Sequence, residues 1–247
     1  WCQSAEQVVN VIYVLCRTPH VVLEPVVKRM ASSAFSSFDE GVSVDSMARV
    51  VFLVGHVALK ELLQIEMVKH KQKERAKRLE KAEAAAAVGE KDKLEEDLGV
   101  EEQDAAFEED YLNSLPDMLV CRNLLGMFGN VMQAILLKPD VYSSRILRAV
   151  ASLSLSKFMV TSSKFCKDNL PLLFQVLDQE EDESIRSNIV IALGDLSYRY
   201  PNLVEPWNAS LYGRMQDKSP VVRKTTIMVL SHLILNGVIK IKNNGGL

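Results

Sequence analysis

Large apolar residues recur at constant distances behind three arginines in the second half of the chain. Arg148, Arg186 and Arg223 follow one another with a period of about 38 residues, as in helical repeats. Apolar residues stand seven and ten positions after each arginine, namely Leu155, Leu193 and Leu230, then Phe158, Leu196 and Leu233. Because these spacings return to one face of an α-helix, each arginine is expected to open a helix with a single apolar stripe. The six apolar residues are therefore predicted to be buried between layers.

This period, with two helices in each unit and no alternating strand pattern, is typical of HEAT or armadillo-type solenoids. The sequence therefore predicts an all-α fold, a right-handed superhelix of antiparallel helix pairs in which no unit buries its apolar face alone. The second helices of the units are expected over 145–158, 184–200 and 220–236, and first helices over 170–177 and 204–215. A further helix is expected over 118–137, with Pro116 at its start.

The first 68 residues carry the same periodicity and are expected to form N-terminal HEAT hairpins. Val8, Val11, Ile12 and Leu15 make the apolar stripe of a first helix, and Pro25 suits the first turn of a second. A third helix is expected to begin at Asp45 or Ser46 as its cap. Its predicted buried residues are Met47, Val50, Val54, Val57, Leu62, Ile65 and Val68.

Residues 69–110 form a charged, low-complexity insertion between this part and the HEAT repeats of 111–247. Its basic residues come first and its acidic residues last. Such a segment buries too little apolar area to offset its ordering entropy. We therefore expect a protruding helix that passes into a disordered linker, with weak or absent order between about Lys71 and Glu108. Both a solvated insertion without a partner and a regulatory or partner-binding loop remain open.

Composition narrows the class of protein further. The net charge of −3 argues against a nucleic-acid binder that acts through overall charge. The four cysteines contain no CxxC pair, which indicates reduced thiols in a cytosolic or nuclear protein. No apolar run reaches the roughly 20 residues of a membrane span, so no membrane partner is expected. The chain starts inside an expected helix without Met and closes no repeat at its end, so we expect an internal fragment of a longer protein.

The sequence offers no constellation of catalytic residues. His20, His56, His70 and His232 lack metal-ligand spacing, and a lone histidine on an amphipathic helix is usually a packing or surface residue. We therefore expect no enzyme activity, no cofactor, no metal and no small-molecule substrate.

The repeat arginines have a structural explanation. In solenoids of this kind, an arginine at the start of a second helix pairs with an aspartate of the preceding turn. Asp182 is the expected partner of Arg186, and Asp217 that of Arg223. Together with Arg148 they would form a ladder that ties neighbouring units, and direct contact with a ligand is the alternative.

Basic residues are slightly in excess in the second half of the chain, whereas the insertion is acidic overall. The densest basic cluster is Arg223 and Lys224 with Lys240 and Lys242. Positive groups on a solenoid can follow a phosphate backbone without reading bases. These four residues are candidates for sequence-independent DNA binding, and a solvated surface is the alternative.

The stretch 185–242 resembles the C-terminal HEAT region of the condensin complex subunit 1 family, the CAP-D type of non-SMC subunit. Three motifs carry this resemblance: Arg186-Ser187-Asn188 leading to Gly194-Asp195-Leu196, the run from Tyr200 to Trp207 with Leu211-Tyr212, and Val222-Arg223-Lys224-Thr225 followed by Ser231 to Leu235. The Pro-Asn-Leu-Val-Glu-Pro-Trp run is the specific part, since HEAT repeats in general share only the arginine and the leucines.

The resemblance implies a non-catalytic scaffold that binds the condensin kleisin subunit, the SMC ATPase subunits and DNA. It also implies a place on mitotic chromosomes in the nucleus, with the cytoplasm as an alternative in interphase. Two alternatives share the fold: the related condensin II subunit, and a HEAT-repeat adaptor or transport receptor that binds peptides.

Overall fold

The computed structural model describes residues 1–35, 43–86, 109–121 and 124–239, without the side chains of 79–86. Within these ranges the chain forms helices and connecting turns, and no strand. Residues 109–121 are helical as well. The bounds are α1 Cys2–Leu15, α2 Pro19–Phe35, α3 Val44–Ala86, α5 Leu124–Leu137, α6 Arg145–Thr161, α7 Ser163–Gln179, α8 Glu183–Arg199, α9 Pro201–Val204, η1 Glu205–Trp207, α10 Asn208–Gly213, η2 Arg214–Gln216 and α11 Pro220–Leu235.

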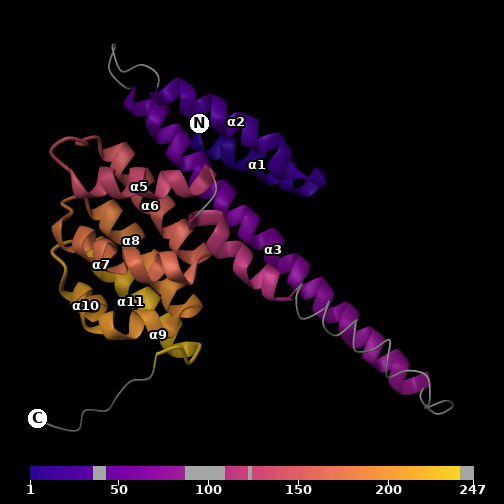
Figure 1. Ribbon diagram of the computed structural model, residues 1–247. Helices are drawn as coiled ribbons and strands as arrows, with labels where there is room; N and C mark the ends of the chain where they lie inside the picture. The colour runs from indigo at the N-terminus through magenta and orange to yellow at the C-terminus, as the bar shows by residue number, and fades with distance from the viewer. Residues whose placement is uncertain (36–42, 87–108, 122–123, 240–247) are drawn as a thin grey trace, which may run out of the picture.

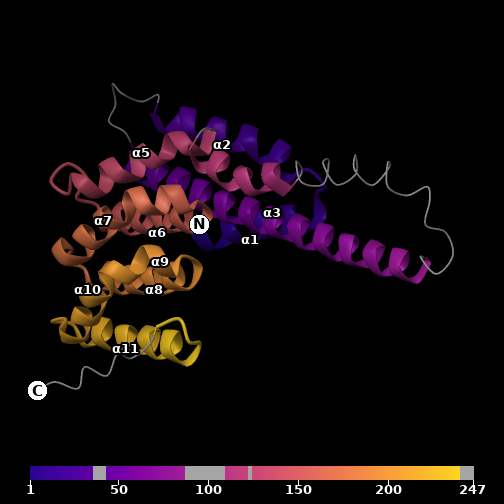
Figure 2. The same ribbon diagram turned by 60° about the horizontal axis from the view of Figure 1, so that its bottom comes forward.

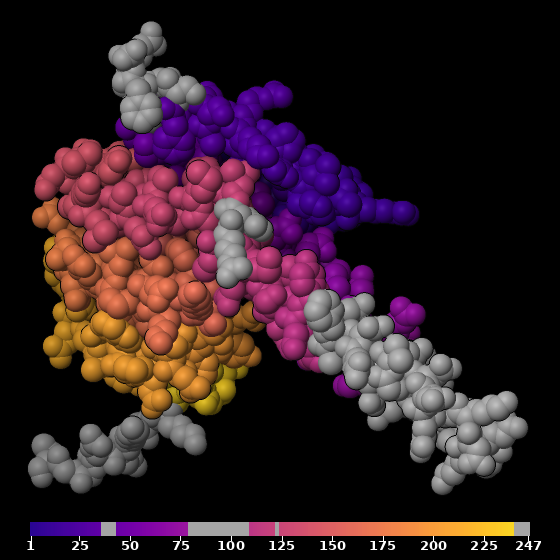
Figure 3. All heavy atoms as spheres, viewed as in Figure 1, coloured from indigo at the N-terminus to yellow at the C-terminus, as the bar shows by residue number. Residues whose placement is uncertain are grey.

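The helices stack in successive layers (Figures 1 and 2). The second helices α3, α6, α8 and α11 each contact the next and form one wall of the stack. The first helices α5, α7 and α9 likewise follow one another along the other wall. In Figure 3 the colours run in bands from indigo through orange to yellow, so neighbours in sequence are neighbours in space. This arrangement confirms the predicted all-α, HEAT-like solenoid.

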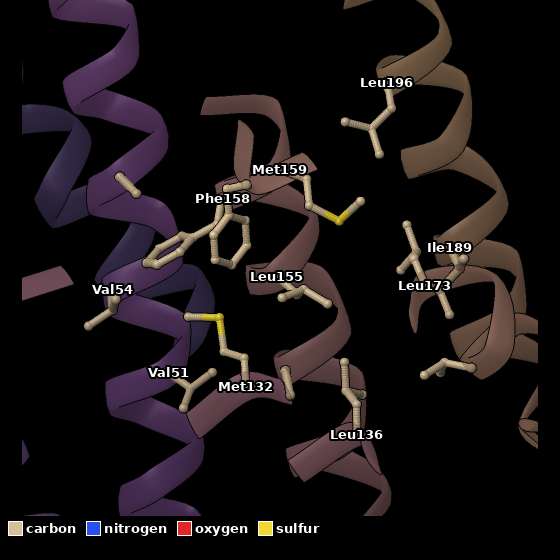
Figure 4. Close-up of a cluster of buried hydrophobic side chains, with 14 of the residues drawn as sticks. Val51, Val54, Met132, Leu136, Leu155, Phe158, Met159, Leu173, Ile189 and Leu196 are labelled. Atoms are coloured by element: carbon tan, nitrogen blue, oxygen red, sulfur yellow. The ribbon is translucent and has the colours of Figure 1, made fainter. Parts of the chain in front are cut away.

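The core lies between the second helices. Figure 4 shows α6 between α3 and α8, with Phe158 beside Val54 of α3 and Met159 beside Leu196 of α8. All six residues predicted from the arginine spacing are buried, so this prediction is confirmed. Full burial of each such side chain contributes about 1.5–3 kcal/mol. Because these side chains fill the spaces between repeats, each layer depends on its neighbours.

The predicted buried face of the first helix is wrong. Val8, Val11 and Leu15 are exposed in α1, whereas Val9 and Tyr13 are buried. Apolar residues occupy more than one side of this helix, so periodicity alone does not select the buried side. The Tyr13 hydroxyl donates to Oε1 of Glu61 on α3 at 2.6 Å, a bond that requires this side of α1 to face α3.

The expected helix starts at two prolines are also wrong. α2 begins at Pro19, and Pro25 lies on its exposed side within the helix. There the missing N–H leaves the Val21 carbonyl without its helical donor, which solvent replaces. Pro116 likewise lies within the helical residues 109–121. On α3, five of the predicted apolar residues are buried, but Ile65 is half-buried and Val68 exposed.

The helical start predicted for the insertion is present, and it extends further than expected. α3 continues through Ala86, past the onset of disorder predicted near Lys71 (Figure 1). The segment is rich in Ala, Lys, Glu and Arg, which favour helix, and it extends a packed helix without a new nucleation step. The linker predicted after it falls on residues 87–108, which lie outside the described residues.

Candidate interaction surfaces

Each of the first two repeat arginines is bonded to an acidic side chain of the following repeat. Nη2 of Arg148, near the start of α6, donates to Oε2 of Glu180 after α7 at 2.6 Å. Nε and Nη2 of Arg186 on α8 donate to the two carboxylate oxygens of Asp217 at 3.0 and 2.8 Å. Nη1 of Arg186 donates to the backbone carbonyls of Glu180 and Glu181 at 2.9 and 2.8 Å. The arginines therefore join adjacent helix pairs.

The predicted partners within this ladder are wrong. Asp182 pairs with Arg145 and not with Arg186. Nη1 of Arg223 donates to the backbone carbonyl of Asp217 at 2.8 Å and not to its carboxylate. Both aspartates accept a hydrogen bond from the backbone N–H two residues later, which directs the carboxylate toward the start of the following helix. The ion pair of each carboxylate is made with an arginine of the preceding repeat, so each ladder contact joins one repeat to the next.

The carboxylate of Asp217 in this ladder remains ionised near neutral pH. Burial alone would raise the pKa of Asp217, but the hydrogen bonds from Arg186 and from the Ser219 N–H, with the charge of Arg186, hold it below its usual value. The side chains of Arg186 and Asp217 are 3% and 5% exposed, so this is a buried, bidentate ion pair. Such a pair is suited to fixing two repeats relative to each other.

The four residues predicted to bind DNA are only partly described. Lys224 is exposed on α11 and Arg223 is half-buried. Arg223 also holds the backbone carbonyls of Asp217 and Lys218, so it has a structural role. Lys240 and Lys242 lie outside the described residues. DNA binding by this cluster stays a prediction. Lys224 is the more exposed of its two described members.

A largely apolar groove, which we call the second-helix groove, runs over α6, α8 and α11. Its volume is about 580 Å³. Ile191, Tyr198 and Met228 line it and are 46%, 65% and 63% exposed. Asp195 also lines it, and burial raises the pKa of this carboxyl while His232 opposes the shift. The groove thus combines exposed apolar side chains with one carboxylate. The sequence analysis singled out Gly194 and Asp195 as part of a family motif but missed the groove.

Gly194 sets the closest approach of α8 and α11 at the floor of this groove. A Cβ atom added at this glycine would lie 2.6 Å from Cγ1 of Val229, which is inside van der Waals contact. The absence of a side chain at Gly194 therefore allows the two helices to approach closely.

The histidines are packing or surface residues, as expected. His56 is buried, its Nε2 lies 3.1 Å from Oδ1 of Asn10, and its ring stacks on Phe52. Burial, followed by the positive charge of Lys157, lowers the pKa of His56 to about 4. His232 is exposed. Over the described ranges, no three or more His, Cys, Asp or Glu residues are grouped as metal ligands.

Among the described helices, none is by itself long and apolar enough to cross a membrane, although the bent pair of Glu109–Cys121 and Leu124–Leu137 passes the same test of length and composition. Stacked helix pairs, buried interrepeat ion pairs and an apolar groove define a HEAT-type interaction protein.

Comparison with known proteins specifies the family. A family model described as non-SMC mitotic condensation complex subunit 1 (Cnd1) matches residues 184–245. Condensin complex subunit 1 of Xenopus laevis is 34% identical over 98% of this chain and 19% of its own length. The Homo sapiens subunit is 30% identical over the same shares. The resemblance to the condensin complex subunit 1 family is therefore confirmed over nearly the whole chain.

Two further relatives bear on the alternatives. Condensin-1 complex subunit CAP-D2 of Arabidopsis thaliana is 29% identical over 97% of this chain and 19% of its own length. Condensin-2 complex subunit D3 of Mus musculus is 28% identical over 40% of this chain and 7% of its own length. The greater coverage favours the condensin I type. The chain spans about a fifth of the length of the condensin I relatives described above.

Proposed function

We propose that this chain is a non-catalytic scaffold segment of a condensin complex. In this role it binds the kleisin and SMC ATPase subunits, contacts DNA without reading its sequence, and acts on mitotic chromosomes in the nucleus. The family resemblance and the buried ladder support a rigid, multi-partner surface. The SMC subunits would supply nucleotide hydrolysis, so the isolated chain should release no phosphate from ATP.

The second-helix groove is the observation that carries the kleisin part of this proposal. Ile191, Tyr198 and Met228 offer apolar contact area that a partner segment would bury. Asp195 would accept a hydrogen bond from a basic residue of that segment, which would replace the water lost on binding. A kleisin segment with two or three apolar side chains and one lysine or arginine has the required chemistry.

A charge placed in the groove tests this proposal. Met228→Glu should weaken copurification of the kleisin with the chain at least tenfold, because a carboxylate would be buried against apolar side chains. Met127→Glu is the matched control, since Met127 is also an exposed helical methionine, on α5 and outside the groove. Equal kleisin recovery with both variants would contradict the role of the groove. Absence of kleisin and SMC subunits from the wild-type preparation would favour the peptide-binding adaptor or transport receptor.

The DNA-binding part of this proposal rests on four basic residues, which we call the C-terminal cluster: Arg223, Lys224, Lys240 and Lys242. Four phosphate contacts would give a log–log salt dependence of affinity of about −3 to −4. Because Arg223 also supports the turn before α11, the clean variant is the triple replacement of Lys224, Lys240 and Lys242 by Ala. Unchanged affinity and slope with helicity retained would assign these lysines to the solvated surface.

A further inference from the structure

A second positively charged surface lies far from α11, on the part of α3 that projects from the stack (Figures 1 and 2). Residues 69–78, which we call the α3 ridge, have the sequence KHKQKERAKR. This segment combines six lysines and arginines with one acid, Glu74, in a chain whose net charge is −3. At 0.15 M salt the Debye length is about 8 Å, so the local charge is set by this segment and its neighbours on α3, among them Glu66, Glu80 and Glu83.

The ridge has an inner and an outer side. On the inner side, Nζ of Lys69 donates to Oδ1 of Asn113 at 2.9 Å, and Nζ of Lys73 lies 3.9 Å from Oε1 of Glu109. Lys71, Arg75 and Arg78 are spaced four and three residues apart, so they share another face of the helix. All three are exposed, and among the described residues none forms an ion pair or hydrogen bond with them. The outer side therefore presents three cations that pair with no described residue.

This arrangement is unfavourable for the isolated helix. Like charges three or four residues apart repel along a helix face, and Lys71–Arg75 and Arg75–Arg78 are such pairs. Glu74, three residues after Lys71 and four before Arg78, is the one acidic residue of the ridge at these spacings, so it offsets only part of the repulsion. A polyanion bound along the outer side would remove the repulsion and fill the missing contacts.

The composition of the ridge selects the kind of polyanion. Protein interfaces depend on buried aromatic or aliphatic side chains, and Ala76 is the sole apolar residue between 69 and 78. The six cations extend over ten residues, or about 15 Å of helix axis. Duplex DNA carries one phosphate charge per about 1.7 Å of its axis, so a straight row of cations meets a continuous row of phosphates. Charge complementarity without apolar contact therefore favours a nucleic-acid backbone.

We propose that the outer side of the α3 ridge, through Lys71, Arg75 and Arg78, binds the phosphate backbone of duplex DNA. This inference shares a ligand with the proposed function but not a site, since Lys224 lies on α11 at the other end of the stack (Figure 1). The ridge and Lys224 would then contact DNA at two separated positions of one chain.

The test measures binding of the 247-residue chain to a labelled 30-base-pair duplex of mixed sequence by fluorescence anisotropy, from 50 to 200 mM KCl. The ridge variant replaces Lys71, Arg75 and Arg78 by Ala, which preserves helix propensity. Loss of three phosphate contacts should reduce the magnitude of the salt slope by about 2.7. The control variant replaces the exposed Lys138, Lys164 and Lys167 by Ala, which changes net charge equally. Circular dichroism verifies that both variants retain their helicity.

A reduced slope in the ridge variant with an unchanged slope in the control variant supports the proposal. Equal reductions in both variants would overturn it, because net charge alone would then explain binding. An unchanged ridge variant would overturn it as well, whatever the triple variant of the C-terminal lysines shows. A ridge that binds polyglutamate but not the duplex would replace DNA with an acidic protein partner. Failure of the C-terminal variant alone would leave the ridge result intact, so the two sites are tested separately.

Discussion

Removing the carboxylate of Asp217 tests whether the buried ladder joins the repeats energetically. In the Asp217→Ala variant, the guanidinium of Arg186 keeps its two carbonyl acceptors but loses its counter-charge inside the protein. Loss of one partner of a buried ion pair costs about 3–5 kcal/mol. Because the carbonyl bonds remain, we expect a loss near the lower end, about 3 kcal/mol. This is a large part of the roughly 5–15 kcal/mol that stabilises a domain.

Trp207 supplies a local signal for this measurement. Its ring stacks on Phe174 with the centroids 4.8 Å apart, and it lies between α8 and α11 in sequence. In a Trp1→Phe background, urea unfolding followed by tryptophan fluorescence reports on this part of the stack. With an m-value of about 3 kcal/mol/M, the midpoint should fall by about 1 M. The matched control is Asp168→Ala, an exposed aspartate of α7, which should change stability by less than about 0.5 kcal/mol.

The pH dependence provides a second readout. The folded pKa of Asp217 lies below its usual value, so the pair contributes stability above about pH 4, and this contribution is lost as the pH falls through the lower folded value. The wild-type protein should therefore lose more stability below pH 4 than Asp217→Ala does. If Asp217→Ala unfolds at the same urea concentration as Asp168→Ala and shows the wild-type acid response, the reasoning about the ladder is refuted.

Three further predictions concern packing and titration. Gly194→Ala should lower the free energy of unfolding in urea by about 1–3 kcal/mol, because the added Cβ would meet Val229. Gly213→Ala, with no atom within 4 Å of the added Cβ, should be neutral or stabilising. Similar losses in both variants would contradict this prediction. Leu193→Ala should cost about 2–5 kcal/mol, and hydrogen exchange should rise in the adjacent repeats as well; a loss confined to α8 would contradict the dependence between layers. The pKa of His56 in the folded protein is lowered to about 4, so the free energy of unfolding should fall as the pH decreases from about 6.5 to 4. His56→Gln should flatten that part of the stability–pH curve. An equal slope in the variant would show that protonation of His56 does not cause the loss.

The sequence predicted the buried positions of the second helices because the same spacing recurs in three repeats, although α8 and α11 also carry apolar residues outside this stripe, such as Ile191 and Met228. Leu155, Leu193 and Leu230 repeat at a fixed distance from an arginine, and only one face of each helix can bury them. In α1, by contrast, apolar residues lie on several sides, and the buried side is selected by Tyr13 and its bond to Glu61, a contact between residues far apart in sequence. Periodicity carries no information about such contacts.

The ladder and the groove were likewise only partly predictable from the sequence. The arginines could be identified from their period, but their partners depend on which way each capping aspartate points, and that is a matter of turn geometry. The second-helix groove was missed because Ile191 and Tyr198 come from α8 and Met228 from α11 of the next repeat, so their proximity exists only after stacking. Apolar residues outside the buried stripe, beside Gly194, were the available signal.

The position of the ladder has a mechanical consequence. Arg148, Arg186 and their partners join the repeats at the edge where the second helices begin, whereas the groove lies further along α8 and α11. Ion pairs and backbone bonds stiffen the first edge, whereas the groove is lined mainly by apolar side chains. The stack should therefore bend about the edge that carries the arginines. A partner bound in the groove would set the curvature of the solenoid. Tension applied along the solenoid would in turn change the affinity for that partner.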